Sequence, residues 1–163
     1  METDFHGLIR TLAQADVQFI VVGGVAASTH GSPRLTVDLD VVYRREDENI
    51  SRLAHALSPL HPYPRGAPKG LPFRWDAETI KRGLNFTLVT SLGALDLLGE
   101  ITGGGGFDDL KPHSLIVKLH GFDCLCLELD WLIKVKRAAG RPKDFEAIAE
   151  LEAIVEERKK LEL

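Results

Sequence analysis

Cysteine is scarce in this sequence of 163 residues: only Cys124 and Cys126 occur, and they stand two positions apart. This spacing is too short for an ordinary stapling disulfide. We therefore expect reduced thiols packed within a strand, as in a cytoplasmic protein. A Cys-x-Cys half-site for zinc is the alternative, but the sequence contains no second cysteine pair to complete it.

Long apolar runs are also missing. The longest, Phe19 to Val22, is far too short to span a bilayer. The N-terminus carries Glu2 and Asp4 and has no basic region followed by an apolar stretch, so it does not resemble a signal peptide. We expect no membrane partner.

No charge of one sign dominates the composition, because 20 basic residues face 24 acidic ones, a net charge of -4. This balance argues against a protein that coats nucleic acid, although a local basic patch can coexist with it. With 44% hydrophobic residues and no low-complexity tract, residues 1–163 are expected to form a single domain around one core.

Two common nucleotide-binding motifs are absent as well. The sequence has no Gly-x-Gly-x-x-Gly dinucleotide fingerprint and no Gly-Lys-Ser/Thr of a Walker loop. A nucleotide site in this chain must therefore be built in another way.

Hydrophobic periodicity predicts an alternation of helices and strands. Helices are expected at residues 4–16, 25–30, 46–60, 76–82, 129–139 and 143–161, and strands at residues 18–22, 35–43, 85–90, 94–101, 115–119 and 124–127. Residues 61–72, with four prolines and two glycines, predict an irregular loop, and long loops of this kind are often functional. Residues 103–106 predict a flexible connector. The mixture indicates an α+β (mixed α/β) fold, a small mixed sheet flanked by helices, with C-terminal helices.

The most informative segment is the predicted strand at residues 35–43. Alternate residues of a strand share a face, so Arg34, Thr36, Asp38 and Asp40 would line one face, and Leu35, Val37, Leu39 and Val41 would face the core. Two carboxylates about 7 Å apart along a strand repel each other unless a cation lies between them. Mg²⁺ prefers such ligands and keeps positions open for phosphate oxygens. The alternative is a half-exposed strand whose outward residues happen to be charged.

A glycine pair, Gly23-Gly24, stands between the first strand and the next helix. Glycines there allow a ligand to approach the backbone closely, and the helix offers free N–H groups to an anion. The alternative is simply a tight turn.

Together, Gly23-Gly24, thirteen intervening residues and Asp38-Leu39-Asp40 resemble the signature of the DNA polymerase β-like nucleotidyltransferase superfamily. The fuller string, which adds His30-Gly31, Arg34 and Thr36, is similar to the abortive-infection toxin-type (minimal) branch. The resemblance implies that Asp38 and Asp40 bind Mg²⁺ or Mn²⁺. It also assigns nucleotide binding to Gly23, Gly24, Ser28, Arg34, Thr36 and Asp144.

A third acid is part of this pattern. Asp96 lies amid apolar neighbours, where a carboxylate is costly unless it is paired or metal-bound, or unless it sits solvated at a strand edge. In the superfamily an acid on a neighbouring strand joins the Asp-x-Asp pair. Asp96 is the best candidate for that third metal ligand, and Glu100 is the weaker alternative.

The C-terminal part also resembles the family, in which a helix carrying a lysine is followed by Arg-x-Lys-Asp. The matching positions are Lys136, Arg141, Lys143 and Asp144. Lys136 would offset charge as pyrophosphate leaves. Alternatively, Asp144 merely suits the first turn of a helix and the basic side chains are solvated. A further acid often follows the Lys-Asp pair in the family, and Phe145-Glu146-Ala147-Ile148 does not carry it at the matching position, which leaves the role of this segment open.

The resemblance implies two-metal transfer of a nucleoside monophosphate from a nucleoside triphosphate (NTP) to a hydroxyl of an RNA 3′ end, a protein or a small molecule. Asp38, Asp40, Asp96 and Lys136 would be catalytic. One rival is a nucleotide-binding antitoxin or regulatory partner without turnover, and another is a Mg²⁺-dependent phosphodiesterase or glycosyltransferase. His30 either caps its helix or lies near the phosphates, and Trp75 and Trp131 either stack on a base or belong to the core.

Overall fold

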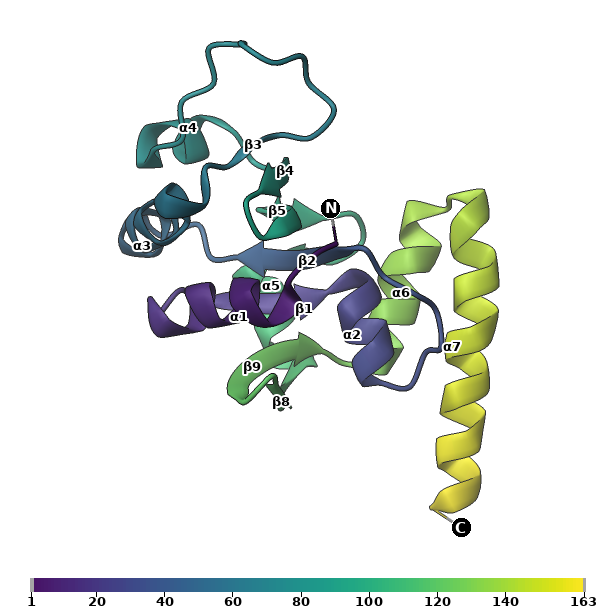
Figure 1. Ribbon diagram of the computed structural model, residues 1–163. Coiled ribbons are helices and arrows are strands. Elements are labelled where there is room, and N and C mark those ends of the chain that lie inside the picture. The colour runs from purple at the N-terminus through teal and green to yellow at the C-terminus, as the bar shows by residue number, and fades with distance from the viewer. Residues whose placement is uncertain (1, 163) are drawn as a thin grey trace.

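The computed structural model describes residues 2–162 and is built around a seven-stranded sheet (Figure 1). The strand order is β3-β4-β5-β2-β1-β9-β8. These strands are β1 (Phe19–Val22), β2 (Asp38–Tyr43), β3 (Tyr63–Pro64), β4 (Phe86–Thr90), β5 (Gly93–Leu98), β8 (Ser114–Leu119) and β9 (Phe122–Leu127). The central pair β1–β2 is antiparallel, whereas β2–β5 and β1–β9 are parallel, so the sheet is mixed as predicted.

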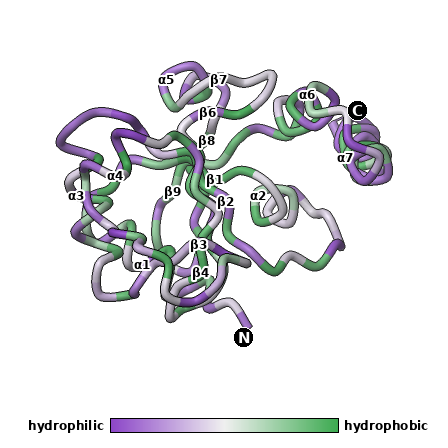
Figure 2. Tube along the Cα trace, turned by 90° about the horizontal axis from the view of Figure 1, so that it is seen from above, coloured by the Kyte–Doolittle hydropathy of each residue, from purple (hydrophilic) through white to green (hydrophobic). Residues whose placement is uncertain are grey.

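Helices cover both faces of this sheet. They are α1 (Phe5–Gln14), α2 (Gly23–Thr29), α3 (Asp47–Leu57), α4 (Ala77–Arg82), α5 (Phe107–Leu110), α6 (Leu129–Ala139) and α7 (Pro142–Leu161), with short 3₁₀ turns at Ser58–Leu60 and Lys111–His113. Seen from above, α1, α3 and α4 lie on one side of the strands, and α2, α6 and α7 lie on the other (Figure 2). Across residues 2–162, none of the helices combines the length and apolar character that crossing a bilayer requires.

The core follows from the strand pattern. All four residues of β1 are buried, which explains its unbroken apolar run, because a central strand has helices on both faces. On β2, Leu39 and Val41 are fully buried and face the core, whereas Asp38 and Asp40 are only partly buried. The alternation predicted for this strand is therefore confirmed from Asp38 to Val41, after which Val42 and Tyr43 are both buried.

The alternation predicted for residues 35–43 is wrong before Asp38. The structure has no strand at residues 30–37, and Leu35 and Val37 are 98% and 75% exposed instead of facing the core. The reason is a lack of pairing partners: β1 pairs with residues 40–43, and β5 pairs with residues 38–42. Arg34 and Thr36 consequently precede β2 and do not lie on it.

Three further expectations need correction. The segment at residues 94–101 is interrupted at Gly99 and forms β5 and a separate β6 (Glu100–Ile101). The glycine connector contains a short strand, β7 (Gly105–Gly106), which pairs with β6. The proline-rich segment is not wholly irregular, since β3 pairs with β4 at the sheet edge.

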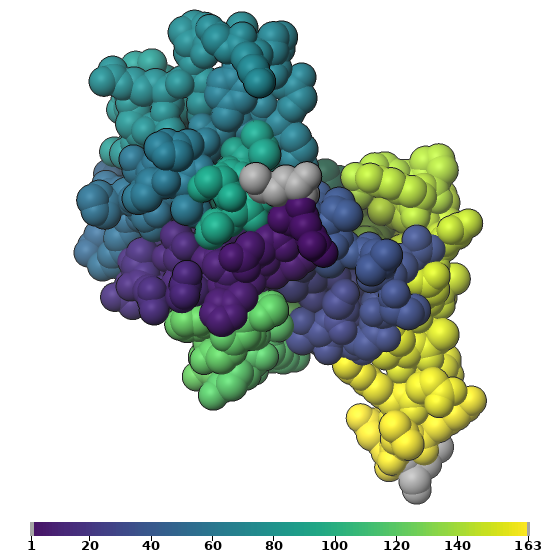
Figure 3. All heavy atoms as spheres, viewed as in Figure 1, coloured from purple at the N-terminus to yellow at the C-terminus, as the bar shows by residue number. Residues whose placement is uncertain are grey.

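The other predicted elements lie close to their predicted positions, whereas α5 and the 3₁₀ turn at Lys111–His113 were not predicted. The Asp4 and Asp76 side chains cap α1 and α4 by accepting hydrogen bonds from the backbone N–H groups of Gly7 and Thr79. The predicted hairpin is β8–β9. Cys124 and Cys126 are buried free thiols on β9, and burial raises their pKa values to about 11 and about 12. In the space-filling view the proline-rich segment and the end of α7 project from opposite ends of the molecule (Figure 3).

Candidate metal centre

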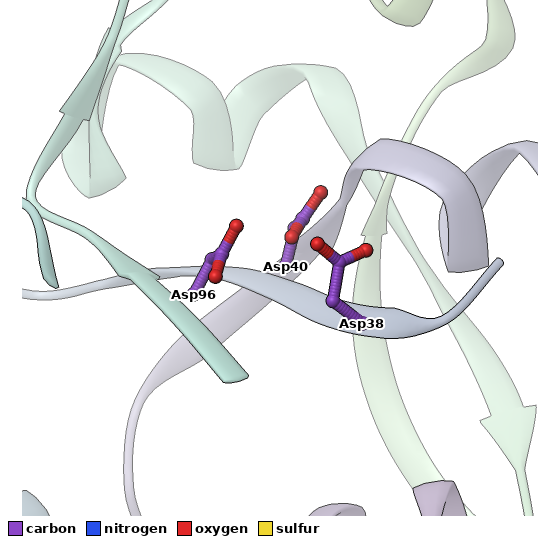
Figure 4. A group of neighbouring side chains, drawn as sticks. All are labelled: Asp38, Asp40 and Asp96. Atoms are coloured by element: carbon purple, nitrogen blue, oxygen red, sulfur yellow. The ribbon is translucent and has the colours of Figure 1, made fainter. Parts of the chain in front are cut away.

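Three aspartates from two neighbouring strands meet on one face of the sheet. Asp38 and Asp40 share the outward face of β2, and the parallel register of β2 with β5 sets Asp96 directly beside Asp40. Their side chains point to the same side (Figure 4), and one carboxylate oxygen from each lies within 4.8 Å of the other two. This group, called the acidic cluster below, can hold a metal ion. Glu100, the alternative third acid, is exposed on β6 beyond the break at Gly99 and does not join it.

The glycine pair lies directly against this cluster. Gly23, the first residue of α2, has a φ of +65°, and a Cβ on it would lie only 2.1 Å from Asp40 Oδ2. A Cβ on Gly24 would lie 2.6 Å from Thr36 Oγ1. Both positions therefore require glycine, because any side chain would push the start of α2 away from the acidic strand.

Asp40 has the most perturbed carboxylate of the cluster. Burial, together with the negative charges of Asp38 and Asp96, raises its pKa to about 8, and the charge of Arg65 only partly opposes this. Within residues 2–162, Asp40 Oδ1 is buried and accepts no hydrogen bond. A buried, unpartnered carboxylate oxygen among two other carboxylates is a donor set that suits a hard divalent cation, so the residues fit Mg²⁺ or Mn²⁺.

Arg65 is a member of this site that the sequence analysis missed. It follows β3 directly, and its Nη2 lies 2.7 Å from Asp96 Oδ1 while its Nη1 lies 3.7 Å from Asp38 Oδ2. The only signal in the sequence was its position in a loop long enough to be functional.

Two cavities open beside the cluster. One of about 390 Å³ is lined by Gly23, Asp40, Lys136 and Arg141, together with apolar side chains of α6. A smaller one of about 190 Å³ is lined by Gly24, Asp38 and again Lys136. Lys136 is thus the basic residue shared by the cavities on either side of the Asp-x-Asp pair.

The other residues assigned to nucleotide binding lie at varying distances from the cluster. Thr36 contacts the glycine turn, and its hydroxyl donates to the Asp38 carbonyl. Arg34 lines the smaller cavity but is half-exposed and forms ion pairs with Glu146 and Glu150 on α7. Ser28 is exposed near the end of α2, away from the helix N-terminus whose N–H groups are free.

Asp144 and its neighbours form the start of α7. The buried Asp144 carboxylate accepts hydrogen bonds from the backbone N–H and the side chain of Arg141. These bonds cap the N-terminus of α7. Burial alone would raise the pKa of Asp144, but the hydrogen bonds and charge of Arg141, aided by Lys136, outweigh burial and lower it. Asp144 therefore anchors the segment that carries Arg141 beside the larger cavity, and Lys143 is exposed.

Contacts also account for His30 and the two tryptophans. Buried His30 lies between the Leu127 carbonyl, 2.8 Å from Nε2, and the Arg158 guanidinium, 3.1 Å from Nδ1. Trp75 donates its indole N–H to the Ala54 carbonyl, and Trp131 stacks on His113. All three thus have structural partners within the chain.

A search of solved structures shows that the architecture is shared. A protein of Thermotoga maritima, whose description as a nucleotidyltransferase is itself provisional and whose crystal structure extends to 1.87 Å, matches with a TM-score of 0.53. The match covers 91% of this chain and 94% of that one, at 15% sequence identity. This likeness establishes the predicted nucleotidyltransferase fold. No model of a protein family matches the sequence, and no curated protein matches it.

Proposed function

We propose that this protein is an enzyme that transfers a nucleoside monophosphate from a nucleoside triphosphate to a hydroxyl group, using Mg²⁺ or Mn²⁺. The observation that carries the proposal is the acidic cluster, with three carboxylate oxygens within 4.8 Å of one another on a nucleotidyltransferase fold. The unpartnered oxygen of Asp40 supports it, because a cation would complete the hydrogen-bonding and charge requirements of that buried group.

Each of two metal ions would be bound by a different pair of these carboxylates. Asp38 and Asp40 would hold one ion, and Asp96 with either of them would hold a second. Divalent cations held by these carboxylates would supply charge neutralisation for the triphosphate and a lower pKa for the acceptor hydroxyl, whose attack on the α-phosphorus would release pyrophosphate. The fixed positions of the three acids on central strands give the reacting groups a rigid frame.

Basic and backbone groups would hold the phosphates. Gly23 and Gly24 begin α2 against the side chains of Asp40 and Thr36, and the backbone N–H groups of this first turn would donate to phosphate oxygens. Lys136 lines both cavities and would offset the charge that develops on the departing pyrophosphate.

The resemblance to abortive-infection nucleotidyltransferases supports a place in a toxin–antitoxin pair, with an RNA 3′ end, a partner protein or a small molecule as acceptor. One observation favours a second function, nucleotide binding without turnover. Arg65 already places a positive charge against Asp96 and Asp38, as an internal substitute for a cation would.

Incorporation of label separates these functions. The protein would be incubated with each of the four α-³²P-labelled nucleoside triphosphates, Mg²⁺ or Mn²⁺, and total RNA, protein or small-molecule extract. We expect label in one acceptor fraction, lost in Asp40→Asn and retained in Asp123→Asn, which makes the same change at an exposed carboxylate on β9. Saturable triphosphate binding without transfer would establish the binding function, and no triphosphate binding would refute both.

A further inference from the structure

Arg65 directly follows the short edge strand β3, yet its side chain reaches the centre of the sheet. Its backbone N–H donates to the Thr87 carbonyl at 2.9 Å, which continues the β3–β4 pairing by one residue. Its Nη2 donates both to the Leu88 carbonyl on β4, at 2.8 Å, and to Asp96 on β5. The side chain therefore crosses the acidic face and ends beside β2.

Two of these anchors do not involve the acids. The bond to the Leu88 carbonyl and the backbone bond to Thr87 hold Arg65 over the cluster even when a carboxylate turns away. An arginine stays protonated at every physiological pH, so this positive charge is a permanent part of the site.

The Arg65 guanidinium does not contact the three acids equally closely. It pairs closely with Asp96, lies 3.7 Å from Asp38, and leaves Asp40 Oδ1 without a partner. A cation drawn to the cluster by Asp40 must therefore share Asp38 and Asp96 with a positive charge that is already there.

We propose that Arg65 is a positioning residue that orients Asp96 and weakens the binding of a divalent cation when no nucleotide is present. A triphosphate brings negative charge that attracts both the cation and the guanidinium, so cation and nucleotide bind cooperatively. The inference rests on the proposed function, and it names Arg65 as the residue that couples the two ligands.

Mn²⁺ alone, titrated by calorimetry into metal-free protein, tests this directly. Because like charges a few ångströms apart in a partly buried site repel strongly, Arg65→Gln should bind Mn²⁺ at least roughly tenfold more tightly than wild type. Arg65→Lys, which keeps the charge, should stay closer to wild type. Arg74→Gln is the matched control, because Arg74 follows the same loop and its side chain is 88% exposed.

A second titration, with a non-hydrolysable nucleoside triphosphate present, measures the coupling. The gain in Mn²⁺ affinity that the triphosphate causes should be several-fold smaller in Arg65→Gln than in wild type. A purely structural role of Arg65 would alter the melting temperature but not this ratio.

If Arg65→Gln does not fold, Asp96→Asn would be compared with the double variant Asp96→Asn/Arg65→Gln. In the double variant both charges of the ion pair are removed together. The double variant should still bind Mn²⁺ more tightly than Asp96→Asn. The inference about Arg65 would be overturned, and the proposed function kept, if Mn²⁺ binding depends on Asp40 but is equal or weaker in the variants that lack the Arg65 charge. No Mn²⁺ binding to wild type or any variant, with or without triphosphate, would refute the proposed function as well.

Discussion

The pH dependence of stability tests the acidic cluster without any assay of activity. In the folded protein the pKa of Asp40 is raised from 3.8 to about 8 by burial and by Asp38 and Asp96. Between these two values Asp40 holds a proton when folded and loses it when unfolded. The folded state therefore binds more protons, and the free energy of unfolding falls as the pH rises through this window. Asp40→Asn is neutral in both states and removes this contribution.

The size of the effect follows from the same shift. Each rise of one pH unit inside the window can lower the free energy of unfolding of the wild type by about 1.4 kcal/mol. The upper limit between about pH 5 and about pH 8 is therefore about 4 kcal/mol. Asp38 and Asp96 are 30% and 20% exposed, so water relieves part of the repulsion. We expect a relative gain of about 2 kcal/mol for Asp40→Asn over that range.

Urea denaturation followed by circular dichroism, with EDTA present, would measure this at several pH values. Asp123→Asn, at an exposed aspartate, controls for the change of side chain. Saturating Mn²⁺ should flatten the wild-type profile, because a cation binds the ionised carboxylate and replaces the proton. Parallel profiles for wild type and Asp40→Asn in EDTA would refute the buried, mutually repelling arrangement of the three acids.

Three more predictions concern the binding of nucleotide and metal. Lys136→Ala should weaken triphosphate binding roughly ten- to a hundredfold at little cost in stability, measured against Lys134→Ala, whose ammonium lies over the Trp131 ring. Mg²⁺ and a triphosphate together should raise the melting temperature more than the sum of their separate shifts, because each strengthens the binding of the other. A single ligand at a hundredfold excess over its Kd stabilises the folded state by about 2.7 kcal/mol. Additive shifts would indicate independent anion binding. Gly23→Ala should lower the free energy of unfolding by about 1–2 kcal/mol, because the φ of this residue is positive. The added methyl group would also contact Asp40, so the Mn²⁺ affinity should fall. Gly121→Ala, with a similar φ and open space around it, should lose only stability.

The sequence predicted the local part of the site well. The Gly23-Gly24 turn and the Asp38-Leu39-Asp40 alternation lie within a short stretch, and a glycine turn between a strand and a helix and the period of a strand are both visible in the residues themselves. That Asp40 and Thr36 are the groups that exclude a side chain at these glycines is seen only in the structure. Asp96 was recognisable because a carboxylate within an apolar run needs a partner.

The errors have a common physical cause, which is that strand pairing is a long-range property. Leu35 and Val37 continue the alternation of β2, but no neighbouring strand extends far enough to pair with them. Arg65 reaches Asp96 across 31 positions of sequence only because β3 joins the edge of β4. Neither the end of a partner strand nor the attachment of an edge strand can be read from local periodicity.

The position of the three acids in the sheet also sets how the site opens. Asp38, Asp40 and Asp96 lie on strands bordered by others on both sides, whereas Arg65 is attached through the two-residue edge strand β3. Edge segments with few hydrogen bonds open by local fluctuation, while central strands open only when the whole protein unfolds. Amide hydrogen exchange should therefore be much faster around Arg65 than around β1 and β2. The acidic cluster thus lies on central strands, whereas the guanidinium that faces it is attached to the sheet through an edge strand.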